Sequence, residues 1–185
     1  LTVHHLTEFD HRRIGILGSD LQTGDTARKV AALQVEMQSQ GLAFNPADIL
    51  HLGFPRPERV SQGGPMASKV FELAREFARR PRNDRPSAIV SIYDGLAYWF
   101  VIGLISVGCR VPEDVSIITY NETVLAQTSI VPLTTIGIAP EIMSKQIVEL
   151  ALEGLAAAEG PNRFVKHIEI EPRLAIRASV DRVGR

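Results

Sequence analysis

Short apolar runs alternate with longer stretches of helical periodicity along most of this sequence, and this alternation restricts the possible folds more than any other feature. Four runs of consecutive apolar residues are typical of strands that are buried on both faces. They are residues 14–17, 49–52, 88–92 and 115–120. Their starts lie about 35, 39 and 27 residues apart, which is near the spacing of strand–helix–strand crossover units. The pattern predicts an α/β fold with a doubly wound parallel sheet.

Helices are expected between these runs. Apolar residues recur every three or four positions over residues 27–37 and 66–77. Gly41 is suited to end the first of these helices, because glycine readily adopts the left-handed conformation found there. A third helix is expected from Asp94, acting as its N-cap, to about Gly108.

The last third of the chain follows a different pattern. A short strand is expected at 134–138, followed by a helix that Pro140 opens. Two further strands are expected at 165–170 and 174–176. Four apolar residues of the helix are expected to face inward: Met143, Ile147, Leu150 and Leu155.

Composition and charge exclude several classes of protein. An apolar share of 45% and a charged share of 22% are ordinary for a soluble globular fold. The formal net charge of −1 gives no basic excess with which this chain itself would bind nucleic acid. The uncharged run 95–109 is too short to span a bilayer, and residues 1–13 do not resemble a signal peptide, so no membrane partner is expected. The single cysteine, Cys109, can form neither an internal disulfide nor a zinc site and is typical of reducing cytoplasm.

No motif of cofactor or acyl-transfer chemistry is present in the sequence. The glycine-rich dinucleotide and P-loop signatures and the G-x-S-x-G elbow are all missing. No catalytic residue, cofactor or metal site is therefore expected. His4, His5 and His11 are interpreted as exposed histidines near a helix end rather than as metal ligands. Arginines between residues 75 and 85 are interpreted as complementing a helix C-terminus, rather than as a phosphate-binding patch.

Polar and aromatic residues follow the expected strands at the edge where an open parallel sheet binds its ligands. They are Phe54, Tyr93, Asp94 and Asn121. This mixture suits a small polar molecule such as a sugar, held by ring stacking and hydrogen bonds. No nucleophile and base stand out among them, so the pattern indicates binding rather than catalysis.

Five segments resemble motifs of the lac-repressor-like (LacI/GalR) transcriptional regulators, in the family's order. Residues 108–117, GCRVPEDVSI, closely resemble the family's G-x-x-V-P-x-D-[IV]-S-[VI] stretch. The other four are residues 11–14, 94–97, 132–136 and 174–179, so the resemblance covers nearly the whole chain. It implies an effector domain like a periplasmic binding protein, built of two α/β subdomains around a cleft.

The resemblance also implies a division of the chain and a set of partners. Residues 1–137 would form the C-terminal subdomain, 138–162 would cross toward the N-terminal subdomain, and 163–185 would return as strands. The implied protein is a cytoplasmic repressor that forms a homodimer and binds operator DNA through a headpiece outside this chain. A small-molecule effector, a sugar or related metabolite, would shift its DNA affinity. The alternative is a periplasmic sugar-binding protein of a transport system, which a signal peptide upstream would identify.

Site residues carry over from the family unevenly. An arginine that binds a sugar hydroxyl falls at Arg28 or at Lys29, and the sequence does not separate the two. The aromatic after the second strand falls near Phe54. The family's Asn-Asp pair has tyrosine at Tyr93, and its aspartate after the fourth strand is replaced by Asn121. Both replacements argue against a common small sugar as the effector, because the tyrosine is bulky and an amide lacks the carboxylate charge.

The expected third helix is apolar on every side, although a surface helix needs only one apolar stripe. One stripe can cover the sheet and consists of Leu96, Phe100, Leu104 and Val107. A second stripe must be buried by something else. The resemblance implies that it forms the dimer contact, whereas the alternative is a helix packed inside the domain. This second stripe consists of Tyr98, Ile102 and Ile105.

Overall fold

The fold is built on a six-stranded sheet in a computed structural model that describes residues 1–19, 24–53, 65–157 and 166–184. The strand order is β2-β1-β3-β4-β5-β6. The first five strands are parallel and β6 pairs antiparallel with β5, which confirms the expected doubly wound α/β sheet. The strands are β1 (Ile14–Gly18), β2 (Ile49–His51), β3 (Ala88–Ser91), β4 (Ser116–Tyr120), β5 (Thr134–Gly137) and β6 (Arg173–Ala175).

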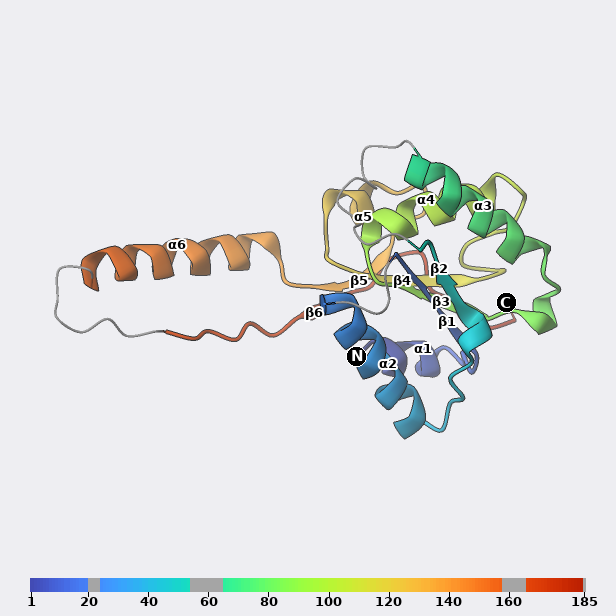
Figure 1. The fold of residues 1–185 in the computed structure, drawn as a ribbon, viewed down its shortest axis with the longest axis horizontal. Coiled ribbons are helices and arrows are strands. Elements are labelled where there is room, and N and C mark those ends of the chain that lie inside the picture. Colours follow the sequence, from blue (N-terminus) through green and yellow to red (C-terminus); the bar gives the residue numbers. More distant parts are fainter. Residues whose placement is uncertain (20–23, 54–64, 158–165, 185) are drawn as a thin grey trace.

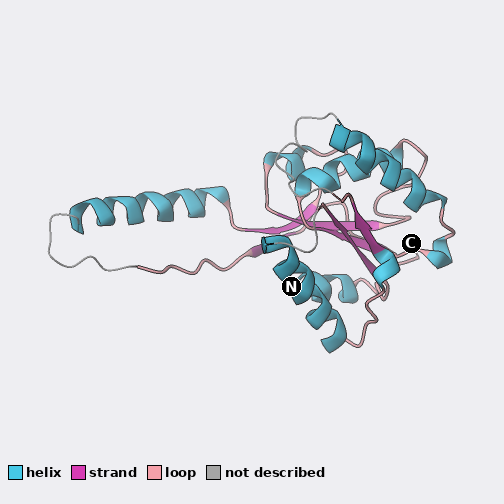
Figure 2. Ribbon diagram, viewed as in Figure 1, coloured by secondary structure: helices cyan, strands magenta, loops and turns pink. Residues whose placement is uncertain are grey.

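Helices cover both faces of this sheet (Figures 1 and 2). One face carries α1 (Thr2–Glu8) and α2 (Gly24–Ser39), and the other carries α3 (Pro65–Arg79), α4 (Asp94–Ile105) and α5 (Val124–Thr128). On β1, Ile16 packs in the cluster with α1 and α2, whereas Leu17 packs in the cluster with α3 and α4. Because both faces are covered, adjacent strand residues are apolar, which explains the uninterrupted apolar runs.

Among the described residues, two short 3-10 helices and a glycine after α2 form parts of the connections between these elements. The 3-10 helices are Pro46–Asp48 and Arg82–Asp84. Gly41 follows α2 with a φ of +70°, as expected for a residue that ends a helix in the left-handed conformation. Leu42 then donates its amide to the carbonyl of Met37, which closes the helix end.

The predicted capping role of Asp94 is wrong. Tyr93 occupies the N-cap of α4 with extended backbone angles, and its side chain makes no capping bond. Asp94 is the first residue of the helix, and its carboxylate accepts a hydrogen bond of 2.9 Å from the backbone amide of Thr123. The side chain turns toward the loop after β4 because that neighbouring loop offers it an amide inside the fold.

The end of the chain leaves the sheet as a projecting arm (Figure 1). Its first limb is α6 (Pro140–Ala157), and the described part of its second limb, residues 166–172, runs beside α6 without forming a strand. The strand expected at 165–170 is therefore wrong for residues 166–170, and Val165 lies outside the described residues. The segment has no neighbouring strand to pair with because it lies away from the sheet. An ion pair of 2.6 Å between Lys166 and Glu153 joins the two limbs.

The inward orientation expected for the apolar residues of α6 is also wrong within this chain. Met143, Ile147 and Leu155 are exposed and Leu150 is only half-buried, because the helix lies away from the sheet. Two other apolar side chains of the same helix, Val148 and Leu152, are exposed as well.

Two of the three N-terminal histidines are buried, which corrects their expected exposure. His4 lies at the surface, but His5 and His11 are 4% and 2% exposed. His11 contacts the Ser87 hydroxyl at 2.9 Å and the Asp181 carbonyl at 3.1 Å, so it joins the start of the chain to its end. Burial lowers the pKa of His11 to about 4, because the fold excludes the water that would stabilise its charged form.

The arginines near the end of α3 act mainly in internal contacts. Arg85 is buried and donates to the carbonyls of Phe77 and Ala78 at the C-terminus of α3, as the helix-end interpretation predicts. Arg80 pairs with the buried carboxylate of Asp48 at 3.2 Å. These contacts support structural roles for the two arginines rather than roles in a phosphate patch.

Candidate functional site

The residues expected at the ligand site lie at the carboxyl edge of the sheet, after neighbouring strands. Ser91 of β3 is paired with Thr119 of β4. Tyr93 and Asn121 each lie two positions beyond one of these paired residues. Because parallel neighbours lie about 4.8 Å apart, Tyr93 and Asn121 emerge side by side at this edge.

Lys29 of α2 reaches this edge and lies between two tyrosines. Its ammonium nitrogen is 5.3 Å from the ring centroid of Tyr93 and 5.3 Å from that of Tyr120. An ammonium at this distance is attracted by the electron-rich ring faces. It also pairs with Asp25 at 2.8 Å, but Asp25 is well exposed, and such surface pairs contribute little. The Lys29 side chain is only 23% exposed, so its cation is presented from a partly enclosed position.

The two tyrosines are held in place by hydroxyl contacts with the helices on their face of the sheet. The Tyr93 hydroxyl lies 2.9 Å from the Thr26 hydroxyl, and the Tyr120 hydroxyl lies 3.0 Å from that of Thr2. Burial raises the pKa of Tyr120 even though the Thr2 contact opposes this, so the phenol stays protonated near neutral pH. Both rings are therefore fixed in position beside the lysine.

The sequence leaves open whether Arg28 or Lys29 lies at the predicted ligand site, and the structure places the two differently. Lys29 contacts the tyrosines, whereas Arg28 is exposed on α2. Adjacent helix residues point about 100° apart, so only one of the two can face the sheet edge. Tyr120 follows from the same strand-end pattern, but the sequence did not single it out as a ligand contact. The signal was its position as the last residue of a strand that ends at the ligand edge.

Asp94, which the sequence predicts as a ligand contact, is buried and engaged in an internal hydrogen bond. Asp94 is 5% exposed, and its carboxylate is bonded to the backbone of Thr123. This hydrogen bond attaches the loop after β4 to the start of α4. Phe54 lies outside the described residues.

Asn121 has an unusual backbone conformation. Its φ is +82°, and its amide donates to the carbonyl of Ile136 on the neighbouring strand at 3.1 Å. Asparagine tolerates this left-handed region better than most residues. Its side chain is exposed, so its amide group is accessible for hydrogen bonding.

The carboxylate after Asn121 is neutralised within the fold. Glu122 pairs with Arg177 and accepts a hydrogen bond from Thr135. Burial alone would raise the pKa of Glu122, but the bonds from Arg177 and Thr135 outweigh burial, and the net pKa lies below its usual value. Glu122 is therefore a charged structural group. The remaining edge combines ring faces, hydroxyls, an amide and an ammonium, which can bind a small polar molecule.

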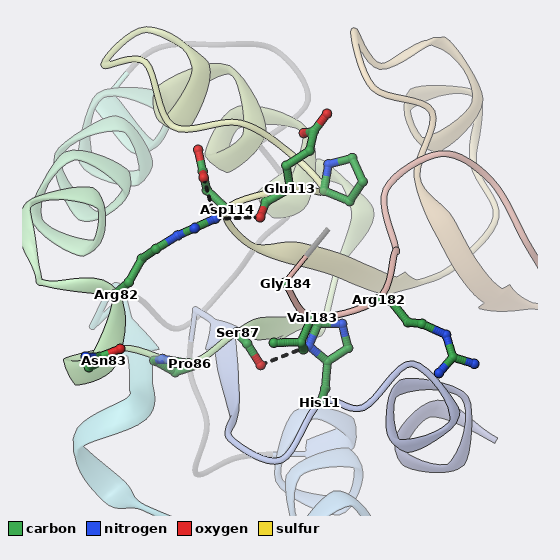
Figure 3. A pocket seen from close by; sticks show the side chains of 11 residues that line it. His11, Arg82, Asn83, Pro86, Ser87, Glu113, Asp114, Arg182, Val183 and Gly184 are labelled. Atoms are coloured by element: carbon green, nitrogen blue, oxygen red, sulfur yellow. Dashed lines mark hydrogen bonds and ion pairs between the residues drawn. The ribbon is translucent and has the colours of Figure 1, made fainter.

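A separate hollow lies near the opposite, amino-terminal edge of the sheet (Figure 3). It measures about 190 Å³ and is lined by His11, Ser87, Arg82 and Asp114, among others. Arg82 pairs with Asp114 at 2.6 Å, and His11 contacts Ser87, so these polar groups are already used in internal contacts. The hollow is thus distinct from the ligand edge.

The second apolar stripe of α4 is neither fully buried nor fully exposed. Tyr98 and Ile102 are half-buried, and Ile105 is 37% exposed. The first stripe covers the sheet as expected, with Phe100 fully buried, but Val107 is 45% exposed because it lies beyond the end of the helix. The partial exposure of the second stripe leaves apolar area available for contact with another surface.

The described ranges hold neither a membrane-spanning helix nor a cluster of metal ligands beside this edge. No helix in the described ranges is long and apolar enough to cross a membrane. Among those same residues, no three histidine, cysteine or acidic side chains come together in a way that could hold a metal ion.

Comparison with known families and curated proteins gives consistent matches. The periplasmic binding protein-like domain matches residues 3–180. The HTH-type transcriptional repressor PurR of Haemophilus influenzae (strain PittEE) is 28% identical over 180 residues, covering 97% of this chain and 50% of the repressor. The arabinose metabolism transcriptional repressor of Geobacillus stearothermophilus is 35% identical over 86 residues, covering 46% of this chain and 24% of the repressor. The chain thus spans about half the length of the PurR relatives it matches.

Solved structures show the same fold. A LacI family transcriptional regulator from Lactobacillus casei with bound glucose superposes with a TM-score of 0.75 at 19% identity, covering 97% of this chain and 60% of the regulator. A regulatory protein of the LacI family from Chloroflexus aggregans gives a TM-score of 0.74 at 23% identity, covering 96% of this chain and 58% of that one. The comparisons confirm the resemblance that the sequence motifs indicated.

Proposed function

Because this chain belongs to the periplasmic binding protein-like domain family, in the form that LacI/GalR regulators contain, we propose that it binds a small effector that controls the operator affinity of a transcriptional repressor. The observation that carries this proposal is the carboxyl edge of the sheet. There Lys29 lies over the rings of Tyr93 and Tyr120, and Asn121 follows the adjacent strand end. Ligands of open parallel sheets bind at this edge.

The effector is proposed to be a small polar molecule, a sugar or a related metabolite, bound without catalysis or a cofactor. Ring faces suit the apolar face of a sugar, and ammonium and amide groups donate to its oxygens. A LacI family regulator of Lactobacillus casei was solved with glucose and with sucrose, and the regulator CelR with cellobiose. Those ligands are stated for those proteins, and they support the ligand class proposed here.

The division of the chain inferred from the resemblance remains a proposal. Residues 1–137 and 163–185 would form the C-terminal subdomain, and 138–162 would cross to the N-terminal one. The projection of α6 away from the sheet supports it, as do the exposed apolar side chains along that helix. The rest of the longer protein would cover them. Operator DNA would be bound through a headpiece outside this chain, in the cytoplasm.

The ligand proposal is tested by comparing the two adjacent cations of α2. Cellobiose would be titrated by calorimetry against the unmutated protein and against the variants Lys29→Met and Arg28→Met, because Tyr93 and Asn121 argue against a small monosaccharide such as glucose. A bonded charge contributes roughly 1.5–3 kcal/mol, so Lys29→Met should weaken sugar binding by about tenfold or more. Arg28→Met is the matched control and should bind as the unmutated protein does. Equal losses in both variants, or a loss in Arg28→Met alone, would contradict the assigned site.

We also propose that the second stripe of α4 forms a homodimer contact. The alternative is a helix whose stripe is covered within its own chain, but Ile105 is partly exposed. A two-fold contact would place Tyr98 and Ile102 against the same residues of a second copy. Alanine at both positions would remove central apolar contacts, which typically contribute about 2 kcal/mol or more each.

Sedimentation at micromolar concentration tests this contact. The unmutated protein should be a dimer, and the variant carrying Tyr98→Ala and Ile102→Ala should be a monomer. Val35→Ala is the control, because Val35 is 67% exposed on α2, on the other face of the sheet. A monomeric unmutated protein, or a double variant that remains a dimer, would show that this stripe is not the interface.

A further inference from the structure

The Glu122–Arg177 pair lies just behind the ligand edge and joins segments far apart in the sequence. The Arg177 guanidinium donates to both carboxylate oxygens of Glu122, and the Thr135 hydroxyl donates to one of them. The side chains of Glu122 and Arg177 are only 14% and 20% exposed. A bidentate, charge-assisted contact of this kind restricts the orientation of both partners more than a single bond does.

Arg177 is itself attached to the strand that leads into the projecting arm. Its guanidinium donates to the carbonyl of Leu133 at 2.7 Å, and its backbone amide donates to the Thr134 hydroxyl at 3.0 Å. It lies two positions after β6, beside the end at which β5 begins, whereas the chain enters the arm after the other end of β5, at Gly137 (Figure 1). Arg177 therefore joins the start of β5 to Glu122.

The backbone next to Glu122 is the segment that these contacts constrain. Asn121 has a φ of +82°, a conformation that costs energy for a residue with a side chain and persists where the surroundings enforce it. Gly137 of β5 allows the close approach, because a Cβ there would lie 2.9 Å from the Glu122 Cβ and 3.0 Å from its backbone nitrogen. The loop thus packs directly on β5, and the Arg177 contact keeps Glu122 against that strand.

We propose that Arg177 is a positioning residue for the ligand site, holding Asn121 in its left-handed conformation through Glu122. This rests on the proposed function, in which Asn121 contacts the effector. A ligand bonded to Asn121 then favours the paired arrangement of Glu122 and Arg177, and this pairing in turn favours ligand binding, because such coupling is reciprocal.

Amide hydrogen exchange of the 185-residue chain, followed by NMR, tests the positioning role without requiring a ligand. The Asn121 amide, which donates to Ile136, is the reporter, and the Ile92 amide, which donates to Leu17, is the reference in the core. Arg177→Gln and Glu122→Gln should each raise exchange at Asn121 by about tenfold relative to Ile92, since each removes a charge-assisted contact. The double variant should exchange no faster than either single variant, because both changes break the same pair.

Controls separate positioning from general stability. Arg80→Gln breaks a comparable pair with the buried Asp48 carboxylate and should leave the ratio of Asn121 to Ile92 exchange unchanged. Arg177→Lys keeps the charge and should restore part of the protection. The positioning role is wrong if Asn121 exchange rises no more than Ile92 exchange in both Arg177→Gln and Glu122→Gln. It is also wrong if Arg80→Gln raises the ratio of Asn121 to Ile92 exchange as much as those two variants do. Cellobiose titration of the unmutated chain tests the proposed function separately, so the two proposals can fail independently.

Discussion

Replacing Gly103 with alanine tests how closely α4 packs against α3. A Cβ at this position would lie 2.7 Å from the Ala74 Cβ and 3.2 Å from the Phe71 Cα. The first distance is too short for two carbon atoms, and the second involves backbone that cannot rotate away. The helices must therefore separate slightly to accept a single methyl group, even though the same change favours helix formation.

The expected loss follows from these two opposing effects. Overpacking a close contact costs about 1–3 kcal/mol, whereas glycine to alanine inside a helix gains about 1 kcal/mol. One of the two short contacts is with backbone, so the overpacking cost should lie in the upper part of its range. We expect Gly103→Ala to lower the free energy of unfolding by about 1–2 kcal/mol, which corresponds to roughly 2–8 °C in Tm for a domain of this size. Adding Ala74→Gly removes the opposing methyl, so the double variant should lose less than the sum of the two single variants.

Urea unfolding followed by tryptophan fluorescence measures this loss. Trp99 is the single tryptophan; it lies in α4, with its ring centroid 5.9 Å from that of Phe71, so it reports on this interface. Gly154→Ala is the matched control, because Gly154 lies within α6 and an added Cβ there meets nothing within 4 Å. The control should show no loss. If Gly103→Ala is as stable as the unmutated protein, the inferred close approach of α3 and α4 is wrong.

Three further predictions concern single side chains. His11 has a pKa near 4 in the fold and about 6.5 when unfolded, so the unfolded state binds a proton first as the pH falls. The free energy of unfolding should therefore decrease by up to about 3 kcal/mol between pH 6.5 and pH 4. Urea titrations should show a smaller decrease in His11→Gln, and equal decreases would contradict the burial argument. Asp94→Ala should lower the free energy of unfolding by about 1–3 kcal/mol, because it leaves the Thr123 amide unpaired. Asp94→Asn keeps an acceptor and should lower the free energy of unfolding by less. Equal losses in the two variants would argue against this contact. Gly137→Ala should displace Glu122 and change the NMR shifts of the loop after β4, and unchanged shifts would show that this approach is looser.

The sequence alone determined much of the sheet and the edge of it at which the ligand site is proposed. Uninterrupted apolar runs predict buried parallel strands, and the residues after them, Tyr93 and Asn121, emerge at one edge as expected. These features depend on residues that are close in the sequence. The periodicity of apolar residues and the end of α2 at Gly41 can therefore be predicted without knowing what packs against each element.

Other features were decided only when distant segments met in the tertiary structure. The rotation of α2 against the sheet brings Lys29, and not Arg28, to the tyrosines. The loop after β4 offers Asp94 an amide that replaces its expected capping role. Glu122 meets Arg177, which lies 55 positions further along the chain. Such contacts depend on the relative orientation of packed elements, and local sequence patterns do not encode that orientation because each element is compatible with several rotations about its own axis.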